Sequence, residues 1–337
     1  MNDLLVGLLS ALVATNPPAA VSNLVQKKTG LSVAIANPDD PVERALKKLM
    51  ADDDAAQAEV DEWIKARNQS GTKQSEVERA AFNLRIKQRF EPVKRAYEDL
   101  LAAHPKHAEA RLAYGSFLND IGDEAGAETQ WLQARDADPK NPAAWNNLAN
   151  FYGHNGDVKK SFEYYARAIE LEPTETVYYQ NMATTVFLFR KDAMEFYKIT
   201  EQEVFAKAMG LYRKALSLDP ENFSLAAELA QTYYGIKPAK FDDTNATRQA
   251  ELKLADEAMT AWQVAQKMAR NELEREGIHL HFARWQINTG RYEEARKSLA
   301  AVTNDFWVQS KSALTKKLAS RETGSTPTNS APAAIEK

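Results

Sequence analysis

Small, aromatic and polar residues recur along the middle of the chain with the spacing of paired amphipathic helices. Laying Ala108–Asn141 over Pro142–Glu175 shifts the sequence by 34 residues and places residues of one kind on residues of the same kind. The matched pairs are Gly115 with Ala149, Gly122 with Gly156, Asp123 with Asp157, Ala127 with Ser161, Trp131 with Tyr165, Ala134 with Ala168 and Pro139 with Pro173. A fixed period of this length is typical of repeat folds, in which each unit buries its apolar face against the next.

Each kind of match has a physical role in a pair of helices. Gly115 and Ala149 lie mid-helix, where a small side chain lets the neighbouring helix approach closely. Gly122 and Gly156 follow a helix end, where left-handed backbone favours glycine. The aromatic residues fill the space between helices, and the prolines end one unit and start the next. The pattern therefore predicts an all-α fold.

The segment Pro142–Glu175 resembles the tetratricopeptide repeat. It carries that family's signature residues, namely Trp145, Leu148, Ala149, Tyr152, Gly156, Tyr165, Ala168 and Pro173, and its period of 34 residues is the family's period. The resemblance implies an α-solenoid of about six helix pairs. It also implies a non-enzymatic scaffold or adaptor, whose first helices line a concave surface that binds a peptide or helix of another protein.

Fainter copies of the pattern extend the array over residues 74–305. Units are expected near 74–107, 108–141, 142–175, 176–222, 223–275 and 276–305. The first unit opens with a capping box from Ser75 to Glu78, and its first helix is degenerate. The fourth unit holds 13 extra residues, which we interpret as a lengthened helix and a second capping box from Thr200 to Glu203. The fifth contains an inserted loop, Gly235–Thr247, and such insertions are an alternative binding surface.

Residues 1–70 do not fit the repeat and are expected to form a small, mostly helical N-terminal cap region of unknown role. Pro41–Met50 is predicted as one helix, and Asp52–Asp54 as the start of another, because carboxylates complement the helix dipole. The stretch Leu31–Ala36 is compatible with a short strand. Residues 69–73 are predicted to be a linker, and the Ser-, Thr-, Pro- and Ala-rich residues 322–337 a disordered tail.

Composition narrows the classes of function. The 43 Lys and Arg residues against 47 Asp and Glu leave a net charge of -4, which argues against a nucleic-acid partner. The absence of cysteine excludes disulfides, thiolate metal sites and a cysteine nucleophile. The apolar run Leu4–Ala14 is too short to span a bilayer, and no Lys or Arg precedes it as in a signal peptide. We therefore expect a cytoplasmic protein without a membrane partner; the alternative is an exported or membrane-associated assembly factor that uses this run.

Catalytic and metal-binding patterns are sparse. His104 and His107 have a metal-ligand spacing, but no acidic or third histidine ligand is evident near them, which favours a surface pair. His279 and His281 lie two apart on a predicted helix, so one is expected to be exposed and the other packed. No phosphate-binding glycine loop, His-Glu-x-x-His or Gly-x-Ser-x-Gly motif is present. We expect no catalytic residue, no cofactor and no metal; an active site within residues 1–70 is the weaker alternative.

Polar positions on the first helices are the candidate peptide contacts. Asn147 and Asn150 lie three apart on one face, and Asn181 and Thr184 hold the equivalent places one repeat later. Relatives often carry asparagine there, and an amide can both donate to and accept from a peptide backbone. The apolar signature residues are expected to face between the helices, and Asn146, Asn147 and Asn150 to point elsewhere.

The candidate ladder is incomplete in the other units. The places equivalent to Asn147 hold Ala113, Glu228 and His281. Arg284 occupies the place of Asn150 in its own unit, but no matching lysine accompanies it, so a two-cation clamp for a carboxylate is not expected. Self-association through the lengthened helices of the fourth unit is compatible with this scheme.

Overall fold

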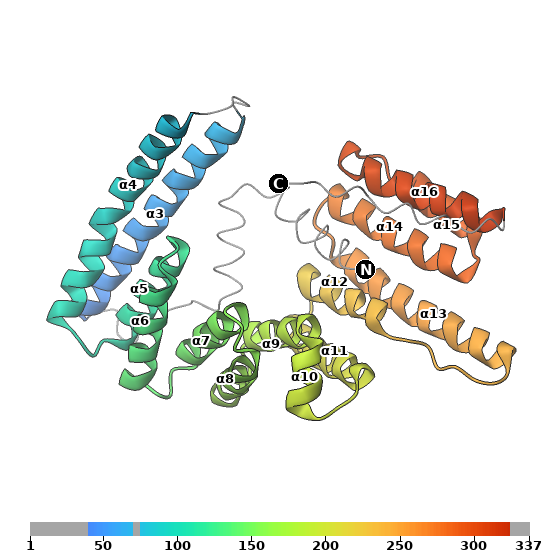
Figure 1. Ribbon diagram of the computed structural model, residues 1–337, viewed down its shortest axis with the longest axis horizontal. Helices are drawn as coiled ribbons and strands as arrows, with labels where there is room; N and C mark the ends of the chain where they lie inside the picture. The colour runs from blue at the N-terminus through green and yellow to red at the C-terminus, as the bar shows by residue number, and fades with distance from the viewer. Residues whose placement is uncertain (1–39, 70–74, 324–337) are drawn as a thin grey trace. The chain divides into compact units, whose positions relative to one another are not determined.

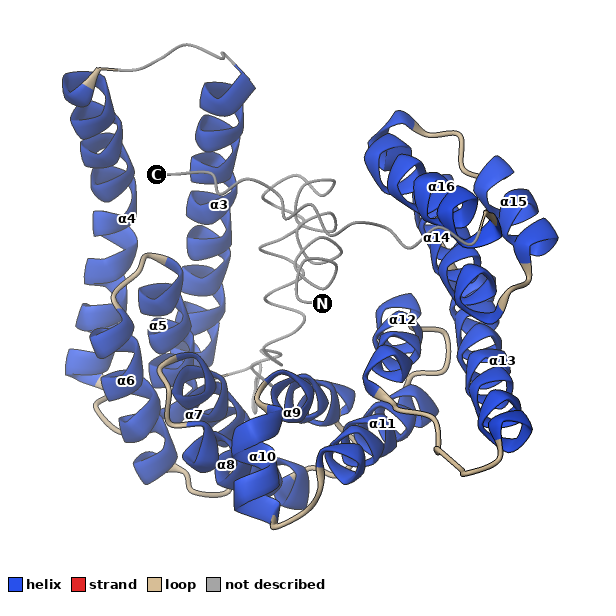
Figure 2. Cartoon of the chain, turned by 45° about the vertical axis from the view of Figure 1, so that its right-hand side comes forward, coloured by secondary structure: helices blue, strands red, loops and turns tan. Residues whose placement is uncertain are grey.

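The computed structural model describes residues 40–69 and 75–323, and it divides the chain into two compact units that meet between Thr185 and Val186. All regular elements in these two ranges are helices, and no strand occurs in them (Figures 1 and 2). The predicted all-α fold is therefore confirmed. The expectations for Leu4–Ala14, for Leu31–Ala36 and for most of the linker and tail concern residues outside the described ranges.

The first unit contains the regular repeats. Its helices are α3 (Pro41–Gln69), α4 (Glu76–Ala103), α5 (Ala108–Asp120), α6 (Glu124–Ala137), α7 (Pro142–His154), α8 (Val158–Leu171) and most of α9 (Thr176–Leu188). The pairs α5–α6 and α7–α8 coincide with the two segments that align in the sequence. Gly122 and Gly156 have φ angles of 82° and 93°, so both act as left-handed helix ends as predicted.

The interlocking of each pair follows from its repeated residues. Trp131 is buried against α5, where its Nε1 donates to the Leu112 carbonyl oxygen over 3.3 Å. Tyr165 holds the equivalent buried place on α8. The small residues Ala127, Ala134 and Ala168 have no exposed surface, so each lets the partner helix approach closely. The roles predicted for these residues are therefore confirmed.

The N-terminal part of the first unit differs from the prediction. One continuous helix, α3, replaces the two helices expected around Asp52–Asp54. Its buried residues Leu46, Leu49, Ala56 and Val60 form one stripe that passes the three aspartates, and packing of this stripe outweighs the local preference for a new helix start. α4 is also continuous, so residues 74–107 do not form a helix pair of their own. Instead, α3 and α4 lie side by side (Figure 1).

The second unit carries the longer and less regular helices. They are α10 (Arg190–Tyr197), α11 (Glu201–Leu218), α12 (Phe223–Thr232), α13 (Thr244–Met268), α14 (Glu272–Thr289), α15 (Tyr292–Ala300) and α16 (Val308–Glu322), with short 3₁₀ turns at Tyr233–Gly235 and Asp305–Trp307. The extra residues of the fourth repeat form the separate helix α10 rather than a lengthened α9. The capping boxes predicted at Ser75 and at Thr200 are both present.

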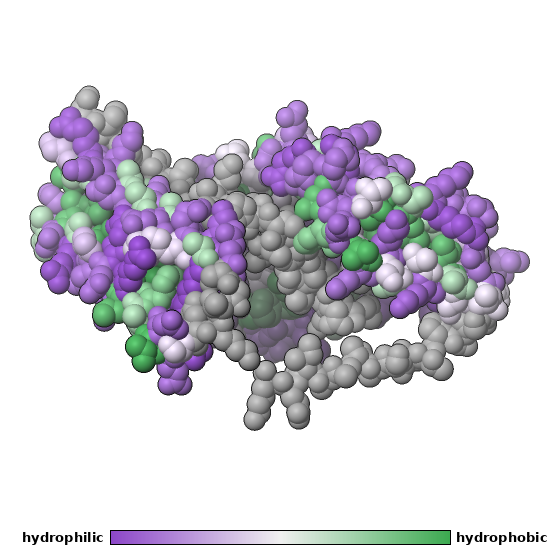
Figure 3. Space-filling view, turned by 90° about the horizontal axis from the view of Figure 1, so that it is seen from above, coloured by the Kyte–Doolittle hydropathy of each residue, from purple (hydrophilic) through white to green (hydrophobic). Residues whose placement is uncertain are grey.

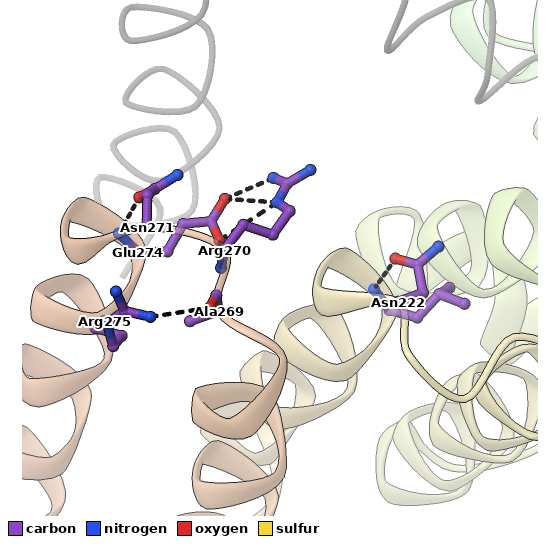
Figure 4. A network of polar contacts seen from close by, with 7 residues as sticks. Asn222, Ala269, Arg270, Asn271, Glu274 and Arg275 are labelled. Carbon is purple, nitrogen blue, oxygen red and sulfur yellow. Dashed lines mark hydrogen bonds and ion pairs between the residues drawn. The ribbon is translucent and has the colours of Figure 1, made fainter.

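Polar contacts fix the turn between α13 and α14. The Arg270 backbone N–H donates to Glu274 Oε2 over 2.7 Å, and its guanidinium pairs with the same carboxylate (Figure 4). Asn271 caps α14, and Asn222 caps α12 in the same view. The Arg270 Cζ also lies 5.8 Å from the centre of the Phe223 ring, which links this turn to the start of α12. The turn is thus held at the ends of three helices.

On the face shown in Figure 3, the described residues are mainly hydrophilic, and hydrophobic residues lie in separate patches. The large hydrophobic side chains most exposed among the described residues are Val77, Leu84, Leu188, Phe241, Phe306 and Val308. Scattered single residues of this kind are normal on folded proteins. In the described ranges, each helix is too short or too polar to cross a membrane.

Gly115 provides a test of the close approach within a pair. A Cβ atom there would lie 2.5 Å from Trp131 Nε1 and 2.6 Å from its Cδ1, so the indole ring would have to move. We expect Gly115→Ala to lower the free energy of unfolding by about 1–3 kcal/mol in urea titrations. Gly210→Ala in α11 is the control, because nothing lies within 4 Å of its Cβ position. It should raise the same free energy by about 0.5–1 kcal/mol. Equal effects of the two changes would contradict this interlock.

An acidic group lies between α3 and α4. Tyr97 of α4 donates its hydroxyl hydrogen to Asp53 Oδ2 over 3.1 Å, and Gln57 Nε2 lies 3.4 Å from Asp53 Oδ1. The pKa of the Asp53 carboxyl is raised from 3.8 to about 7, chiefly by burial, with smaller increases from the charges of Asp120 and Asp54; the hydrogen bonds from Tyr97 and Gln57 oppose the shift. The hairpin therefore contains a carboxyl group that prefers to be protonated.

The raised pKa of Asp53 predicts a pH dependence of stability. Between pH 3.8 and about 7 the folded state binds this proton and the unfolded state does not, so the free energy of unfolding falls as pH rises. We expect Asp53→Asn to stabilise the protein by about 2 kcal/mol at about pH 8 and to change little at about pH 4. Thermal unfolding at both pH values measures this. Asp52→Asn, at an exposed neighbour, should show no such difference.

Candidate peptide-binding site

Amide side chains from α7 and α9 meet in the first unit. Asn181 Nδ2 donates to Asn146 Oδ1 over 3.1 Å, and Asn146 Nδ2 lies 3.5 Å from Asn147 Oδ1. We call these three residues the amide cluster. Asn146 is fully buried and Asn147 is 2% exposed, so neither amide lies open to solvent. Because these amides are buried, each amide atom without a hydrogen bond lowers the stability of the folded protein.

Asn147 has an unsatisfied donor. Its Nδ2 atom is buried and makes no hydrogen bond with any described residue. Its Oδ1 atom has only the long contact with Asn146. Such a group costs about 1–3 kcal/mol compared with a satisfied one. Buried donors without a partner are rare in native structures, so each one calls for a specific explanation.

Asn150 is held by a different network on the same helix. Its Oδ1 accepts a short hydrogen bond from the Tyr165 hydroxyl, and Thr185 Oγ1 lies 3.4 Å from the same hydroxyl. Burial raises the pKa of the Tyr165 hydroxyl well above its usual value, so this group stays a donor at neutral pH. Asn150 is half-buried. α8 therefore orients a candidate contact residue of α7.

Thr184 is oriented by its own helix. Its Oγ1 donates to the Gln180 carbonyl oxygen over 3.0 Å, and the residue is half-buried on α9. The structure therefore brings Asn147 close to Asn181 through Asn146, and it places Asn150 and Thr184 on these same two helices. Asn146 was not predicted as a site residue, because its position follows a signature tryptophan and offers no sequence signal of an amide partner on α9.

Arg284 lies in the second unit, in an aromatic setting. Its Cζ is 5.6 Å from the centre of the Tyr234 ring, and the Tyr234 hydroxyl oxygen lies 2.9 Å from His281 Nδ1. His281 stacks on Trp262 with ring centres 3.8 Å apart. Burial, with Arg284 nearby, lowers the pKa of His281 to about 3, so the imidazole is neutral at physiological pH. His281 is therefore part of the packed core, and Arg284 is the charged side chain beside these aromatic rings.

Lys317 of α16 is a further cation in the second unit. It donates through Nζ to Asn288 Oδ1 over 2.7 Å. Burial lowers the pKa of Lys317, and the positive charges of Arg284 and Arg321 lower it further. The lysine was missed because the array was expected to end at residue 305. The apolar pair Leu314 and Leu318, four residues apart, was the available signal for one more helix.

The other ionisable side chains of interest are His279, His107 and the pair Asp242–Asp243 of the inserted loop, and their surroundings differ. Of the second histidine pair, His281 is packed as expected, whereas His279 is half-buried and its Nε2 lies 3.3 Å from Gln266 Nε2. Asp242 and Asp243 are exposed, and Asp243 caps α13. His107 caps α5 through Nδ1, which accepts from the Ala110 backbone N–H over 3.3 Å. None of these contacts forms a set of nucleophile, base and orienting group within the described residues.

Comparison with known families agrees with the repeat geometry. The sequence profile of the tetratricopeptide repeat matches residues 94–134 and 122–176, which extend from the second half of α4 to the end of the α7–α8 pair. Residues 94–176 of this chain therefore consist of tetratricopeptide repeats. The matched tetratricopeptide segment contains Asn146, Asn147 and Asn150, whereas Asn181, Thr184 and Arg284 lie beyond it. No curated protein matches the chain.

Solved structures with a similar arrangement of helices include other repeat proteins. MamA is 21% identical, with 55% of this chain and 85% of that chain covered and a TM-score of 0.40. YrrB, described as a tetratricopeptide protein with an unusual peptide-binding site, is 11% identical over 66% and 98% of the two chains, with a TM-score of 0.48. PilF of Pseudomonas aeruginosa is 16% identical over 72% and 95%, with a TM-score of 0.47.

The unsatisfied donor of Asn147 predicts that this residue lowers stability. Asn147→Leu replaces the amide by an apolar group of similar shape, so we expect the free energy of unfolding to rise by about 1 kcal/mol. Asn150→Leu should lower it by about 1–2 kcal/mol, because the buried Tyr165 hydroxyl loses its acceptor. Urea titration of both variants beside the wild type measures the difference. A loss of stability in Asn147→Leu as large as in Asn150→Leu would show that Asn147 is satisfied in the free protein.

Proposed function

We propose that this protein is an interaction scaffold that binds a peptide or helical segment of another protein along the first helices of its repeats. The observation that carries the proposal is the buried donor of Asn147, which belongs to an amide cluster shared by α7 and α9. A peptide carbonyl oxygen is an acceptor that suits this donor. Asn150 and Thr184 are the proposed further contacts on the same two helices.

Neutral amides favour recognition of the peptide main chain. An asparagine side chain offers one acceptor and two donor hydrogens, which matches the alternating groups of an extended backbone without specifying side chains. Affinity and specificity would then come from the repeats together, since each repeat adds a small polar contact to a rigid surface. Such a surface would bind extended peptide segments as a class, and the residues around the asparagines would set which peptide sequences bind best.

Arg284 is proposed as a contact of a different kind in the second unit. Its guanidinium is supported by the Tyr234 ring, and Lys317 provides a further positive charge in the same unit. Two cations of this kind attract a carboxylate more strongly than a neutral amide does. We propose that this part of the protein contacts an acidic residue or a chain terminus of the partner.

The proposal is tested by partner capture with matched variants. We expect cross-linking and affinity purification from the native cell to recover one stoichiometric partner with the wild type and at least about tenfold less with Asn147→Leu, because about 1.4 kcal/mol of binding free energy corresponds to a tenfold change. Asn147→Leu is preferred to truncation because it is expected to keep the fold stable. Glu163→Ala, on the exposed face of α8 in the same repeat, is the control and should recover the partner fully.

Three outcomes of this experiment would argue against the proposal, each for a different reason. Equal recovery with Asn147→Leu and with the wild type would show that the amide cluster is not the contact surface. Equal loss with Asn147→Leu and Glu163→Ala would indicate a general defect rather than a local contact. If the wild type cross-links only to its own copies, the scaffold proposal fails in favour of self-assembly.

A further inference from the structure

Two carboxylates and an imidazole meet where α3 begins beside α5. His107 Nε2 lies 3.5 Å from Glu43 Oε1, and His107 Nδ1 lies 3.3 Å from Glu109 Oε2. One ligand atom from each of the three residues can be chosen so that all lie within 4.8 Å of one another. Glu43 comes from the first turn of α3, whereas His107 and Glu109 come from the start of α5. Glu109 lies two residues after His107 in the sequence, whereas Glu43 is far from both in the chain and is brought to them only by the fold.

Glu43 is the unusual member of this group. The residue is 8% exposed, and its Oε2 atom is buried without a hydrogen-bond partner among the described residues. Its Oε1 atom faces His107 at a distance longer than a good hydrogen bond. Burying a carboxylate with an unsatisfied oxygen is costly unless a positive charge or a metal ion accompanies it.

We propose that Glu43, His107 and Glu109 form a binding site for a divalent transition-metal ion of the zinc class, which ties the first turn of α3 to the first turn of α5. Three ligands of these types are the usual complement of protein donors for zinc with one position left open. Imidazole together with carboxylates selects ions of this class over calcium and magnesium, which prefer oxygen ligands alone.

Small side-chain movements complete the site. Ligand atoms around a tetrahedral zinc ion lie about 3.3 Å apart, given bonds of about 2.0–2.1 Å. The Glu109 side chain is 25% exposed and begins a helix, so its carboxylate can approach without disturbing the core. The site therefore requires no change of backbone.

The site would act on the fold rather than on a substrate. α3 otherwise meets the array mainly through α4, and a metal bound by Glu43 and His107 would add a direct link from α3 to α5. Because the ion would bind the folded chain more tightly than the unfolded chain, its concentration would control how firmly α3 is held. This property is independent of the proposed partner binding on α7 and α9.

The test uses the full chain without a polyhistidine tag, stripped of metal and titrated with zinc chloride in a calorimeter. We expect one saturable zinc ion per chain and a rise in the melting temperature. His107→Asn keeps a side chain able to cap α5 and should weaken zinc binding at least about 30-fold, in the range seen when metal sites lose such groups. Glu43→Gln should have a similar effect. His104→Asn, at the exposed neighbouring histidine, should bind zinc as the wild type does.

Circular dichroism of each variant without zinc separates loss of the site from loss of the fold. If His107→Asn is folded yet still binds zinc with unchanged affinity and stabilisation, the assignment is overturned. It is also overturned if the wild type binds no saturable ion, or if His104→Asn is the variant that loses binding. If His107→Asn does not fold, Glu109→Gln, which removes a partly exposed ligand, must show the weaker zinc binding for the proposal to stand.

Discussion

The close approach of the two helices in each repeat is the constraint on which the rest of the structure depends. On one side it requires a residue with little or no side chain, as at Gly115, and on the other a large ring, as at Trp131. In the next repeat Ala149 has no exposed surface, and its carbonyl oxygen accepts from Ser161 Oγ over 2.7 Å. Because neither space nor hydrogen-bonding capacity is left over at these contacts, the pair behaves as one rigid unit.

Rigid pairs explain why polar residues can be placed with precision on the first helices. Tyr165 belongs to the second helix of its pair, yet its hydroxyl orients Asn150 on the first. The amide cluster then joins α7 to α9 of the following repeat. Replacing a buried polar group and its partner by apolar groups of the same shape can be neutral or stabilising, so these amides are not required for packing.

The N-terminal hairpin shows a different balance. α3 and α4 are long helices, and acidic groups lie between them at Asp53 and beside α5 at Glu43. Asp53 is partly satisfied by Tyr97, while Glu43 keeps an oxygen without a partner. Protonation can relieve the first, and a bound cation can relieve the second. The stability of this hairpin is therefore expected to respond to solution conditions more than that of the regular repeats does.

The sequence alone determined the features that depend on local spacing. The period of 34 residues, the left-handed glycines at Gly122 and Gly156, and the capping boxes at Ser75 and Thr200 all follow from neighbours within a few helical turns. Only the tertiary structure decided that α3 is continuous, that Asn147 is buried, that the charge of Arg284 acts on Lys317, and that Glu43 faces His107. Those outcomes depend on contacts between residues far apart in the chain. A local sequence pattern does not contain the apolar surface or the charge that a distant contacting residue contributes.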